Sequence, residues 1–513
     1  MKKLPLILLL ICISIYSLYF SLFTINRYQK FYAHYYDLGI MHHTVYNTYK
    51  AIETGDFSRI LELTNPHNYS ADQIKRMAIH NDMLLALFAP FYFIYDGPET
   101  LLILQSVGVA LGALFVFGIV KVVFPEDKYQ DWIGLIFAIA YLLYPPLQKG
   151  NSFEFHAATL ATTFLLAMYY FWLIKRYKLS FAFMLLALLS KEQVGLTTAA
   201  FGVFILIEKY KYQKINNLVK IFSFENISRF IKKFRTDKSL TYSFLLIIIG
   251  IAWVILSITV IIPMARGEWH FAAKYYDHII QNPWKIPYFL TKRYVISYMW
   301  DLLGPLGLVS LAAPMQLLMA SPEFAINLLS GNSNMRNTYF HYQSVITAFV
   351  FISAIYGVKK ITNYKLRITN LSRDLLTHVV VLFMLISSVF FSYTSSSLPY
   401  AKLSDMYPWG KAQGKYDDVI LWKNKLDQDQ TKVSTTGKLA PHFTSRQYFY
   451  DFSWKYVYAD YIVIDEHDAR YGYLKETSAS AYKALQDDPK YIKIYDKDGI
   501  EVYKKLKVSN LGV

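Results

Sequence analysis

Long apolar segments constrain this chain more than any other feature of its sequence. Four of them, of roughly 17–25 residues, are long enough to cross the hydrocarbon core of a membrane: Leu4 to Phe23, Leu101 to Val123, Leu240 to Met264 and Leu375 to Phe391. They must be helical, because backbone N–H and C=O groups cannot stay unpaired in lipid. With the shorter apolar segments between them, we expect a mainly α, polytopic bundle of roughly 10–12 membrane helices.

The composition supports a membrane protein and excludes several other classes. Of the 513 residues, 54% are hydrophobic and 17% are aromatic, more than a soluble chain of this length usually carries. The single cysteine, Cys12, lies inside the first apolar segment, so the sequence offers neither a disulfide framework nor a thiolate metal cluster. The net charge of +16 does not indicate nucleic-acid binding, because nine Lys or Arg gather between Lys209 and Lys238. Such a cluster is typical of a cytoplasmic loop beside anionic lipid headgroups.

The charges around the apolar segments predict the topology. Lys2 and Lys3 precede the first segment and no small-residue cleavage site follows it, so we predict a retained signal anchor with a cytoplasmic amino terminus in the cell membrane. The positive-inside rule places the basic loops 209–239 and 359–374 in the cytoplasm. The first outer loop, residues 25–82, then lies outside. Its Tyr, His, acidic and amphipathic stretches predict short helices on the membrane surface.

Two turn-like sequences interrupt the apolar segments. Asp96-Gly97-Pro98-Glu99 ends the segment from Met83 to Tyr95, which is too short to span and is interpreted as half-inserted or re-entrant. Gly304-Pro305-Leu306-Gly307 breaks the segment from Val295 to Ala320. It indicates either the turn of a hairpin of two short helices or a kink in one span.

The last part of the chain has the character of a small water-soluble domain. After a transmembrane domain over residues 1–393, Lys and Arg nearly balance Asp and Glu in residues 394–513, and the apolar runs shorten to strand length. Tyr461 to Ile464 predicts a buried strand, and the residues on both sides of Lys497-Asp498-Gly499 alternate as in a β-hairpin. With helices expected at 415–428 and 477–486, this is an extracytoplasmic α/β domain.

Asp37 is the candidate catalytic residue. It comes directly after the first hydrophobic segment, where a spanning helix should emerge into water, in the sequence Tyr36-Asp37-Leu38-Gly39-Ile40. An ionisable group at such a place is costly and therefore indicates function. The alternative is that Asp37 only caps the surface helix that follows, since Asp is favoured at that position.

Further polar residues should converge on the outer face and could bind a substrate. The predicted topology places carboxylates, imidazoles and cations there: His80, Glu154, His156, Lys191, Glu192, Arg336 and His341. A carboxylate can accept the proton of an attacking hydroxyl, and cations can hold a departing phosphate. Two structural alternatives stay open: Lys191 and Glu192 as an internal ion pair, and Glu154 with His156 as interfacial anchors.

No cofactor is expected from the sequence. His34 and Asp37 are three residues apart, but two ligands without a third at a suitable spacing do not make a metal site, so no metal is predicted. Asp427-Gln428-Asp429 is interpreted as a solvated helix face. Neither a Walker-type glycine loop nor a Gly-x-Ser-x-Gly elbow is present, which argues against ATP-driven transport and serine hydrolysis.

Several short sequences resemble a family of uncharacterised prokaryotic membrane proteins, a domain of unknown function related to the GT-C glycosyltransferases. In chain order they are Tyr36 to Ile40, Ala89 to Tyr92, Tyr144 to Pro146, Phe153 to His156, Ser190 to Glu192, Asn327 to Ser330, His341 with Tyr342, Leu439 to Phe443 with Arg446, and Ala459 to Asp465. GT-C enzymes place an acid in the first outer loop, and Asp37 matches that position. Leu38 stands where many mannosyltransferases have Glu, and Gln193 where the family more usually has Asp.

The resemblance implies a membrane glycosyltransferase that moves a sugar from a polyprenyl-phosphate donor to an acceptor at the outer membrane face. Asp37 would act as base or acceptor-binding acid, and the other candidate residues would line the donor site. The partners would be membrane lipids, the lipid-linked sugar and an acceptor, with no nucleic acid. His442 and Arg446 would bind acceptor or partner, or serve structure only. The rival interpretations are a transporter or flippase of lipid-linked sugars or polymers, and a non-catalytic membrane scaffold.

Overall fold

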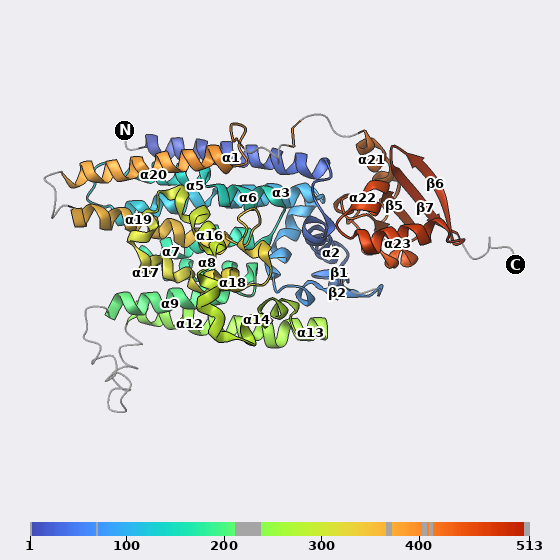
Figure 1. The fold of residues 1–513 in the computed structure, drawn as a ribbon, viewed down its shortest axis with the longest axis horizontal. Helices are drawn as coiled ribbons and strands as arrows, with labels where there is room; N and C mark the ends of the chain where they lie inside the picture. The colour runs from blue at the N-terminus through green and yellow to red at the C-terminus, as the bar shows by residue number, and fades with distance from the viewer. Residues whose placement is uncertain are drawn as a thin grey trace, which may run out of the picture.

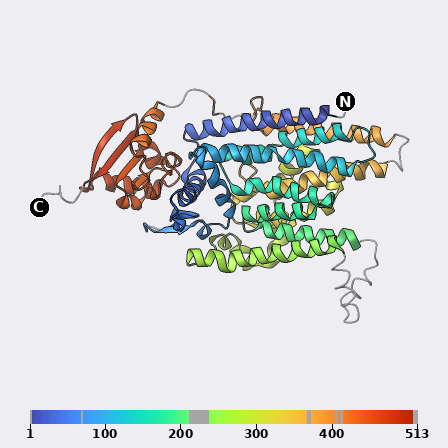
Figure 2. The ribbon, with the colours of Figure 1, turned by 180° about the vertical axis from the view of Figure 1, so that it is seen from behind.

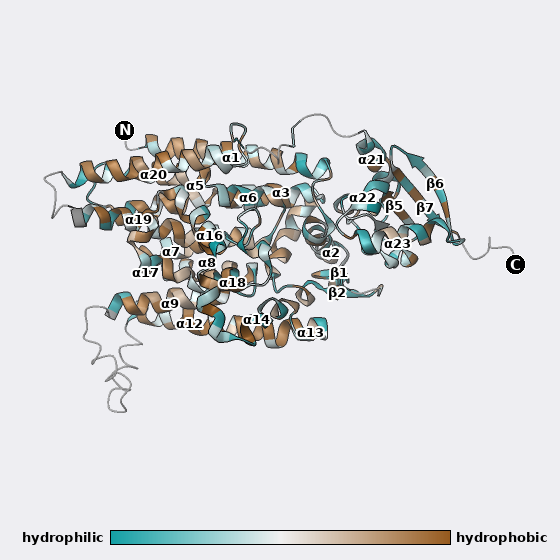
Figure 3. Ribbon diagram, in the orientation of Figure 1, coloured by the Kyte–Doolittle hydropathy of each residue, from teal (hydrophilic) through white to brown (hydrophobic). Residues whose placement is uncertain are grey.

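The computed structural model describes residues 3–67, 70–210, 237–365, 372–402, 408–409 and 414–506. A long bundle of helices makes up most of the molecule, and a smaller unit of strands and helices sits at one end of it (Figures 1 and 2). The amino terminus lies toward the opposite end of the bundle (Figure 1). Apolar residues dominate the bundle helices, whereas the end unit mixes polar and apolar segments (Figure 3).

Five helical segments among the described residues are long and apolar enough to cross a membrane. They are α1 (Leu4–Gln29), α3 with α4 (Pro98–Ala110 and Gly112–Val123), α12 with η6 and α13 (Lys238–Leu256, Ser257–Ile261 and Ile262–Arg266), α19 (Ser344–Lys365) and α20 (Arg373–Ser395). In α1, Ile15 and Leu18 are 62% and 64% exposed while Leu9 and Phe20 are fully buried. Lipid chains can cover an exposed apolar face of this kind.

Shorter helices complete the bundle and confirm the predicted mainly α architecture. They are α5 (Gln130–Leu143), α6 (Pro145–Phe153), α7 (Ala161–Leu173), α8 (Tyr177–Ser190), α9 (Val194–Tyr210), α14 (Asp277–Ile280), α15 (Ile286–Leu290), α16 (Arg293–Leu303), α17 (Pro314–Leu317) and α18 (Ser321–Leu329). Met83–Phe93 forms a 3₁₀ helix, η4, which is too short to span. At Gly304–Gly307 the α16 helix ends in a turn with φ +61° at Gly307, so it does not continue as one span through this sequence.

The first outer loop forms a helix that is largely buried inside the protein. Its main helix, α2 (Ile40–Thr54), buries every residue from Ile40 to Tyr49. The polar residues that made this helix look amphipathic are paired inside the protein. His42 Nε2 lies 2.8 Å from Ser445 Oγ and its Nδ1 lies 2.7 Å from Tyr92 Oη. A short antiparallel pair, β1 (Glu62–Thr64) and β2 (Gln73–Lys75), follows.

The end unit is an α/β domain built on one five-stranded sheet in the order β4-β3-β5-β7-β6. The strands are β3 (Val433–Thr435), β4 (Phe449–Asp451), β5 (Tyr461–Asp465), β6 (Tyr491–Lys497) and β7 (Ile500–Lys505). β3 is parallel to β4 and β5, whereas β5–β7 and β7–β6 are antiparallel. The helices are α21 (Lys415–Lys425), α22 (Glu466–Tyr471) and α23 (Lys475–Gln486), so the predicted strand, hairpin and two helices are confirmed.

One face of this sheet shares its core with the first outer loop. Val433, Val463 and Val502 belong to the same buried cluster as Phe31 and Tyr35 from the loop. Ala481, Tyr482 and Leu485 of α23 cover the other face. The end unit is therefore packed on the segment that carries Asp37 and is not a separate domain on a tether.

Polar contacts join the same two parts. Arg59 donates to both carboxylate oxygens of Asp429 at 2.8 and 2.9 Å. Asp429 lies beyond the end of α21, so the interpretation of Asp427-Gln428-Asp429 as a solvated helix face is wrong. His442 stacks on Tyr28 with 4.1 Å between ring centroids, and its Nε2 lies 3.2 Å from the Tyr28 carbonyl oxygen.

Candidate active site

A cavity of about 460 Å³ lies where the bundle meets the outer loops. One part of its wall is apolar and comes from the ends of α9 and α12 with η6: Leu196, Val254 and Ile258. Another part is polar and aromatic, with side chains from Asp37, His80, His156, Lys191, Glu192, His270 and His341 and from four tyrosines. Six of the eight residues predicted to form the site therefore line one cavity, although they come from distant parts of the sequence.

Asp37 lies in η1 (Tyr35–Gly39), a π-helical turn between α1 and α2. The turn is held from two sides by backbone hydrogen bonds. Glu154 accepts from the N–H groups of His34 at 3.1 Å and Leu38 at 2.7 Å, and the Tyr35 N–H donates to the Gly437 carbonyl of the end unit at 3.0 Å. A turn fixed on both sides gives the Asp37 side chain a defined direction into the cavity.

A row of rings links Asp37 to Lys191 along the cavity wall. His156 Nε2 lies 3.0 Å from Asp37 Oδ1. The His156 ring stacks on His341 with centroids 3.8 Å apart, and His341 lies against Tyr342 at 4.4 Å. The Lys191 ammonium lies 5.5 Å from the centre of the Tyr342 ring. A carboxylate and a cation thus face the same space without neutralising each other.

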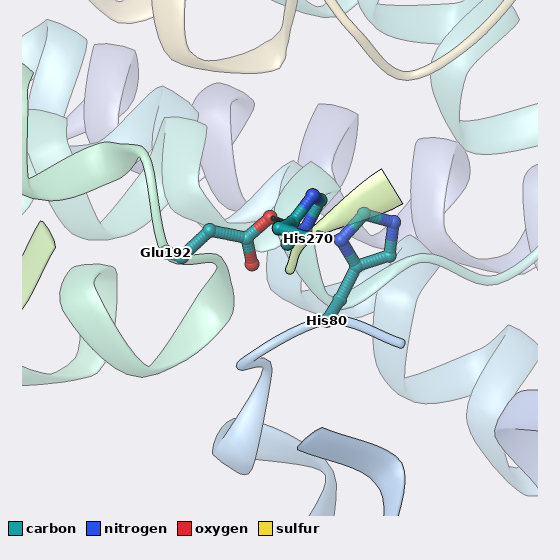
Figure 4. A group of neighbouring side chains, drawn as sticks. All are labelled: His80, Glu192 and His270. Carbon is teal, nitrogen blue, oxygen red and sulfur yellow. Dashed lines mark hydrogen bonds and ion pairs between the residues drawn. The ribbon is translucent and has the colours of Figure 1, made fainter. Parts of the chain in front are cut away.

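Glu192 pairs with two histidines (Figure 4). Its Oε1 lies 2.9 Å from His80 Nδ1 and 3.4 Å from His270 Nε2, and its Oε2 accepts from the Asn81 N–H at 3.1 Å. The predicted internal pair of Lys191 with Glu192 is therefore wrong, because the carboxylate faces the imidazoles. Among the described residues, His80, Glu192 and His270 form the one group whose ligand atoms lie close enough together to hold a metal ion.

Two site residues were missed by sequence reasoning. Arg76 lines the cavity beside Asp82 and forms a buried, two-bonded ion pair with it at 2.7 and 2.8 Å. His270 comes from the Trp- and Tyr-rich stretch after α13, which indicates an interfacial segment rather than a site. No spacing rule connects it to His80 or Glu192, so the sequence alone carries no signal for this cluster.

Two of the predicted binding residues do not line the cavity. Glu154 is buried and its carboxylate supports the Asp37 turn, so it positions the site and does not contact the cavity. Arg336 donates to the Ser330 carbonyl and lies 4.3 Å from the Tyr294 ring centre. Glu154 therefore supports the Asp37 turn, and Arg336 contacts Ser330 and Tyr294.

His442 and Arg446 both make internal structural contacts. Both side chains are almost fully buried, at 1% and 2% exposure. Arg446 donates to the carbonyls of Phe443, Thr431 and Leu426, the last two at 3.1 and 3.0 Å. A role of either residue in binding an acceptor or partner stays a prediction.

Burial and neighbouring charges shift the pKa values of several groups that line the cavity. Burial raises the pKa of Asp37, but the hydrogen bond from His156 and the nearby charges of His156, His34 and Arg76 outweigh it and leave the pKa lowered. Burial lowers the pKa of His80 to about 4. Burial also lowers the pKa of His341 well below its ordinary value. Asp37 is thus available at neutral pH to accept a hydrogen bond or a proton.

The sequence matches a protein-family model over most of its length. The model is that of DUF2079, described as a predicted membrane protein, and it covers residues 27–502. The match includes the Asp37 turn, the bundle and nearly all of the end unit. No curated protein matches the chain in sequence.

Solved structures share the fold. ArnT from Cupriavidus metallidurans, in the crystal structure with bound undecaprenyl phosphate, superimposes with a TM-score of 0.50 at 10% identity, over 98% of each chain. The apo crystal structure of the same protein gives a TM-score of 0.48 at 9% identity, over 91% of this chain and 93% of that one. The first comparison shows that the chain shares the fold of ArnT over nearly its whole length, including the end unit.

Proposed function

We propose that this chain, which belongs to the DUF2079 family of predicted membrane proteins, is a GT-C-type glycosyltransferase. It moves a sugar from a polyprenyl-phosphate donor to an acceptor at the outer membrane face. One observation carries the proposal: an ionised carboxylate, Asp37, and a cation, Lys191, face one cavity whose other wall is apolar and belongs to the bundle. A lipid-linked phosphosugar has these three properties in one molecule, namely an apolar tail, an anionic phosphate and a sugar.

The apolar wall provides a path for the lipid tail. Ile258 lines the cavity and is 37% exposed. Around it, Ile255 and Leu256 are about half exposed, at 54% and 50%. The cavity therefore borders a face that would lie in hydrocarbon, and a polyprenyl tail can stay in the membrane while its phosphate reaches Lys191.

Lys191 is suited to hold the phosphate. Among the described residues, no carboxylate lies within ion-pair distance of its ammonium group. The ammonium group lies over the Tyr342 ring. A cation kept unpaired in a partly buried cavity favours an anionic ligand. Arg76 adds positive charge nearby, although Asp82 neutralises much of it.

Asp37 is suited to activate the acceptor. In the proposed reaction the acceptor hydroxyl gives its proton to Asp37, and its oxygen forms a bond to the anomeric carbon of the sugar. The bond from that carbon to the phosphate oxygen breaks at the same time, and the electron pair leaves with the polyprenyl phosphate. His156 keeps the carboxylate oriented through the 3.0 Å contact, and the charge gained by the leaving phosphate is stabilised by Lys191.

The distribution of charge supports an outward-facing site. α9 ends and α12 begins at the end of the bundle that lies away from the end unit, here also called the sheet domain (Figure 1). The basic segment 209–239 connects α9 to α12. By the positive-inside rule that end is cytoplasmic. The cavity and the sheet domain would then lie on the extracytoplasmic side.

The test is a transfer assay in proteoliposomes. Radiolabelled polyprenyl-phosphate sugars and a cell-envelope acceptor extract are supplied to the wild type, to Asp37→Asn and to Asp72→Asn, an exposed acid in the same outer loop. We expect label on the acceptor with the wild type and Asp72→Asn, and a loss of about 10²–10⁴-fold with Asp37→Asn.

Two results would contradict the proposal. Label that crosses the bilayer on an unchanged lipid would favour a carrier. Equal transfer by the wild type and Asp37→Asn would remove Asp37 from the reaction.

A further inference from the structure

We propose that His80, Glu192 and His270 form a binding site for one divalent transition-metal ion, with Zn²⁺ as the best-fitting ion. The inference adds a metal to the polar wall of the cavity, where the sequence predicts none. Its existence does not depend on the proposed function, although the role suggested below for the metal rests on it.

The three side chains already have the arrangement of a ligand set. Their ligand atoms all lie within 4.8 Å of one another. His80 Nδ1 lies 2.9 Å from Glu192 Oε1, and His270 Nε2 lies 3.4 Å from the same oxygen. Ligands about 2.0–2.2 Å from a tetrahedral Zn²⁺ lie roughly 3.3–3.6 Å apart, so small shifts are enough to admit the ion.

The donor chemistry favours zinc over magnesium or calcium. Two imidazoles and one carboxylate suit a borderline ion, whereas Mg²⁺ and Ca²⁺ prefer oxygen ligands.

Backbone N–H groups donate to two of the three ligands. The Asn81 N–H donates to the second oxygen of Glu192 at 3.1 Å, which leaves the first oxygen for the metal. The Ala272 N–H donates to His270 Nδ1 at 3.0 Å. In the metal-free state the His270 proton therefore lies on Nε2, where no hydrogen bond satisfies it. Ligation through Nε2 would move that proton to Nδ1 and give up the Ala272 bond.

The position of the site suggests what the metal would do. All three ligands line the same cavity as Lys191 and Asp37, and three protein ligands leave a fourth position for an outside group. If the proposed function holds, that position faces the donor phosphate. A metal there would add a second positive group beside Lys191 without using Asp37.

The experiment measures metal binding directly and needs no transferase activity. The purified protein is treated with a chelator, loaded with Zn²⁺ or Co²⁺ and dialysed, and its metal content is determined by elemental analysis. We expect about one metal per chain in the wild type and in His67→Gln, an exposed histidine that lines the cavity outside the cluster. Glu192→Gln and His80→Gln should retain less than a tenth of it.

A second variant distinguishes ligation from a change in folding. In His270→Cys loaded with Co²⁺, a sulfur ligand should produce a near-ultraviolet charge-transfer band that the Co²⁺-loaded wild type lacks. The proposal is overturned if the wild type retains no metal, if Glu192→Gln retains as much as the wild type, or if His270→Cys binds Co²⁺ without the band. Each result would mean that the three residues form only a hydrogen-bonded network.

Discussion

At the scale of single residues, the account depends on how Asp37 is held. Glu154 accepts two N–H groups of the turn, from His34 and Leu38. In Glu154→Gln one oxygen becomes an NH₂ group that faces these donors, so the turn should shift. Because a displacement of about 1 Å can cost about 10²-fold in rate, we expect transfer to fall by up to that factor while donor affinity stays unchanged.

The control for this prediction is Glu268→Gln, which changes an acid that is 79% exposed at its side chain. Rate constants at saturating donor and donor binding are measured separately for both variants. A Glu154→Gln enzyme with full activity would show that the turn does not need this support.

Lys191 should act mainly on donor binding. Losing a charged hydrogen bond to a phosphate costs about 1.5–3 kcal/mol, which corresponds to at least about a tenfold loss of affinity. We expect this loss in Lys191→Gln and none in Lys274→Gln, which changes an exposed lysine outside the cavity. Equilibrium binding of polyprenyl phosphate to detergent-purified protein measures it, and equal affinities of the two variants would refute the assignment.

Residue-scale prediction relied on the cost of an isolated polar group beside an apolar segment. That cost singled out six residues that the structure places around one cavity: Asp37, His80, His156, Lys191, Glu192 and His341. Arg76 and His270 were missed because they lie in stretches where Arg and His are unremarkable. Glu154 was selected for the same reason, because an isolated charge beside an apolar segment is costly. Its partners are backbone N–H groups of another segment, and a sequence does not show such contacts.

At the scale of elements, the packing of α9 against α12 depends on the close approach of Gly195 and Gly250. A Cβ added to Gly250 would lie 2.4 Å from the Gly195 carbonyl oxygen, and one added to Gly195 would lie 2.3 Å from that of Gly250. Small residues allow such contacts between membrane helices. We expect Gly250→Ala to destabilise the protein by about 1–3 kcal/mol, seen as a lower thermal midpoint. Gly414→Ala, in open space, should leave the midpoint unchanged.

The contact between the end of α1 and the sheet domain should weaken in acid. Burial lowers the pKa of His442 to about 3, below the ordinary value of about 6.5. The unfolded chain therefore binds the proton more tightly, so stability is complete above about pH 6.5 and falls as the pH drops toward 3. Protonation would also place a proton on Nδ1, which has no partner in the described structure.

Hydrogen exchange at several pH values tests this dependence. The protection factors, which are exchange rates corrected for the intrinsic rate at each pH, should fall around Tyr28 and residues 433–449 between pH 7 and pH 5. His442→Gln should show a flatter dependence, since it has no group that titrates in this range. An identical dependence in both proteins would assign it to another group.

At the scale of elements, the sequence predicted which segments are helices or strands better than it predicted which of them are buried. The apolar segments and the strand and hairpin patterns predicted most helices and strands because periodicity reports what one element buries. The packing of α2 could not be predicted in this way. Its polar positions are satisfied by Tyr92 and Ser445, which are about 50 and 400 residues away, and a local pattern cannot distinguish them from positions in water.

At the scale of the whole molecule, the sheet domain and the site form one structural unit. The Gly437 carbonyl accepts from Tyr35 in the Asp37 turn, and a Cβ at Gly437 would lie 2.1 Å from His34 Nε2. We therefore expect Gly437→Ala to reduce transfer without releasing the protein from the membrane. A transfer assay beside a membrane-extraction assay separates the two effects, and full activity in this variant would show that the domain does not influence the turn.

The central claim is that the cavity receives a polyprenyl-phosphate donor, and the most direct measurement locates that donor. The Asp37→Asn variant in proteoliposomes is given a polyprenyl-phosphate sugar with a photoreactive group near the phosphate, and the crosslinked peptides are identified by mass spectrometry. The account predicts crosslinks at Leu196, Val254 or Ile258, lost on competition with unlabelled polyprenyl phosphate and reduced by Lys191→Gln. Crosslinks spread over exposed faces such as that of α1, unaffected by the competitor, would contradict it.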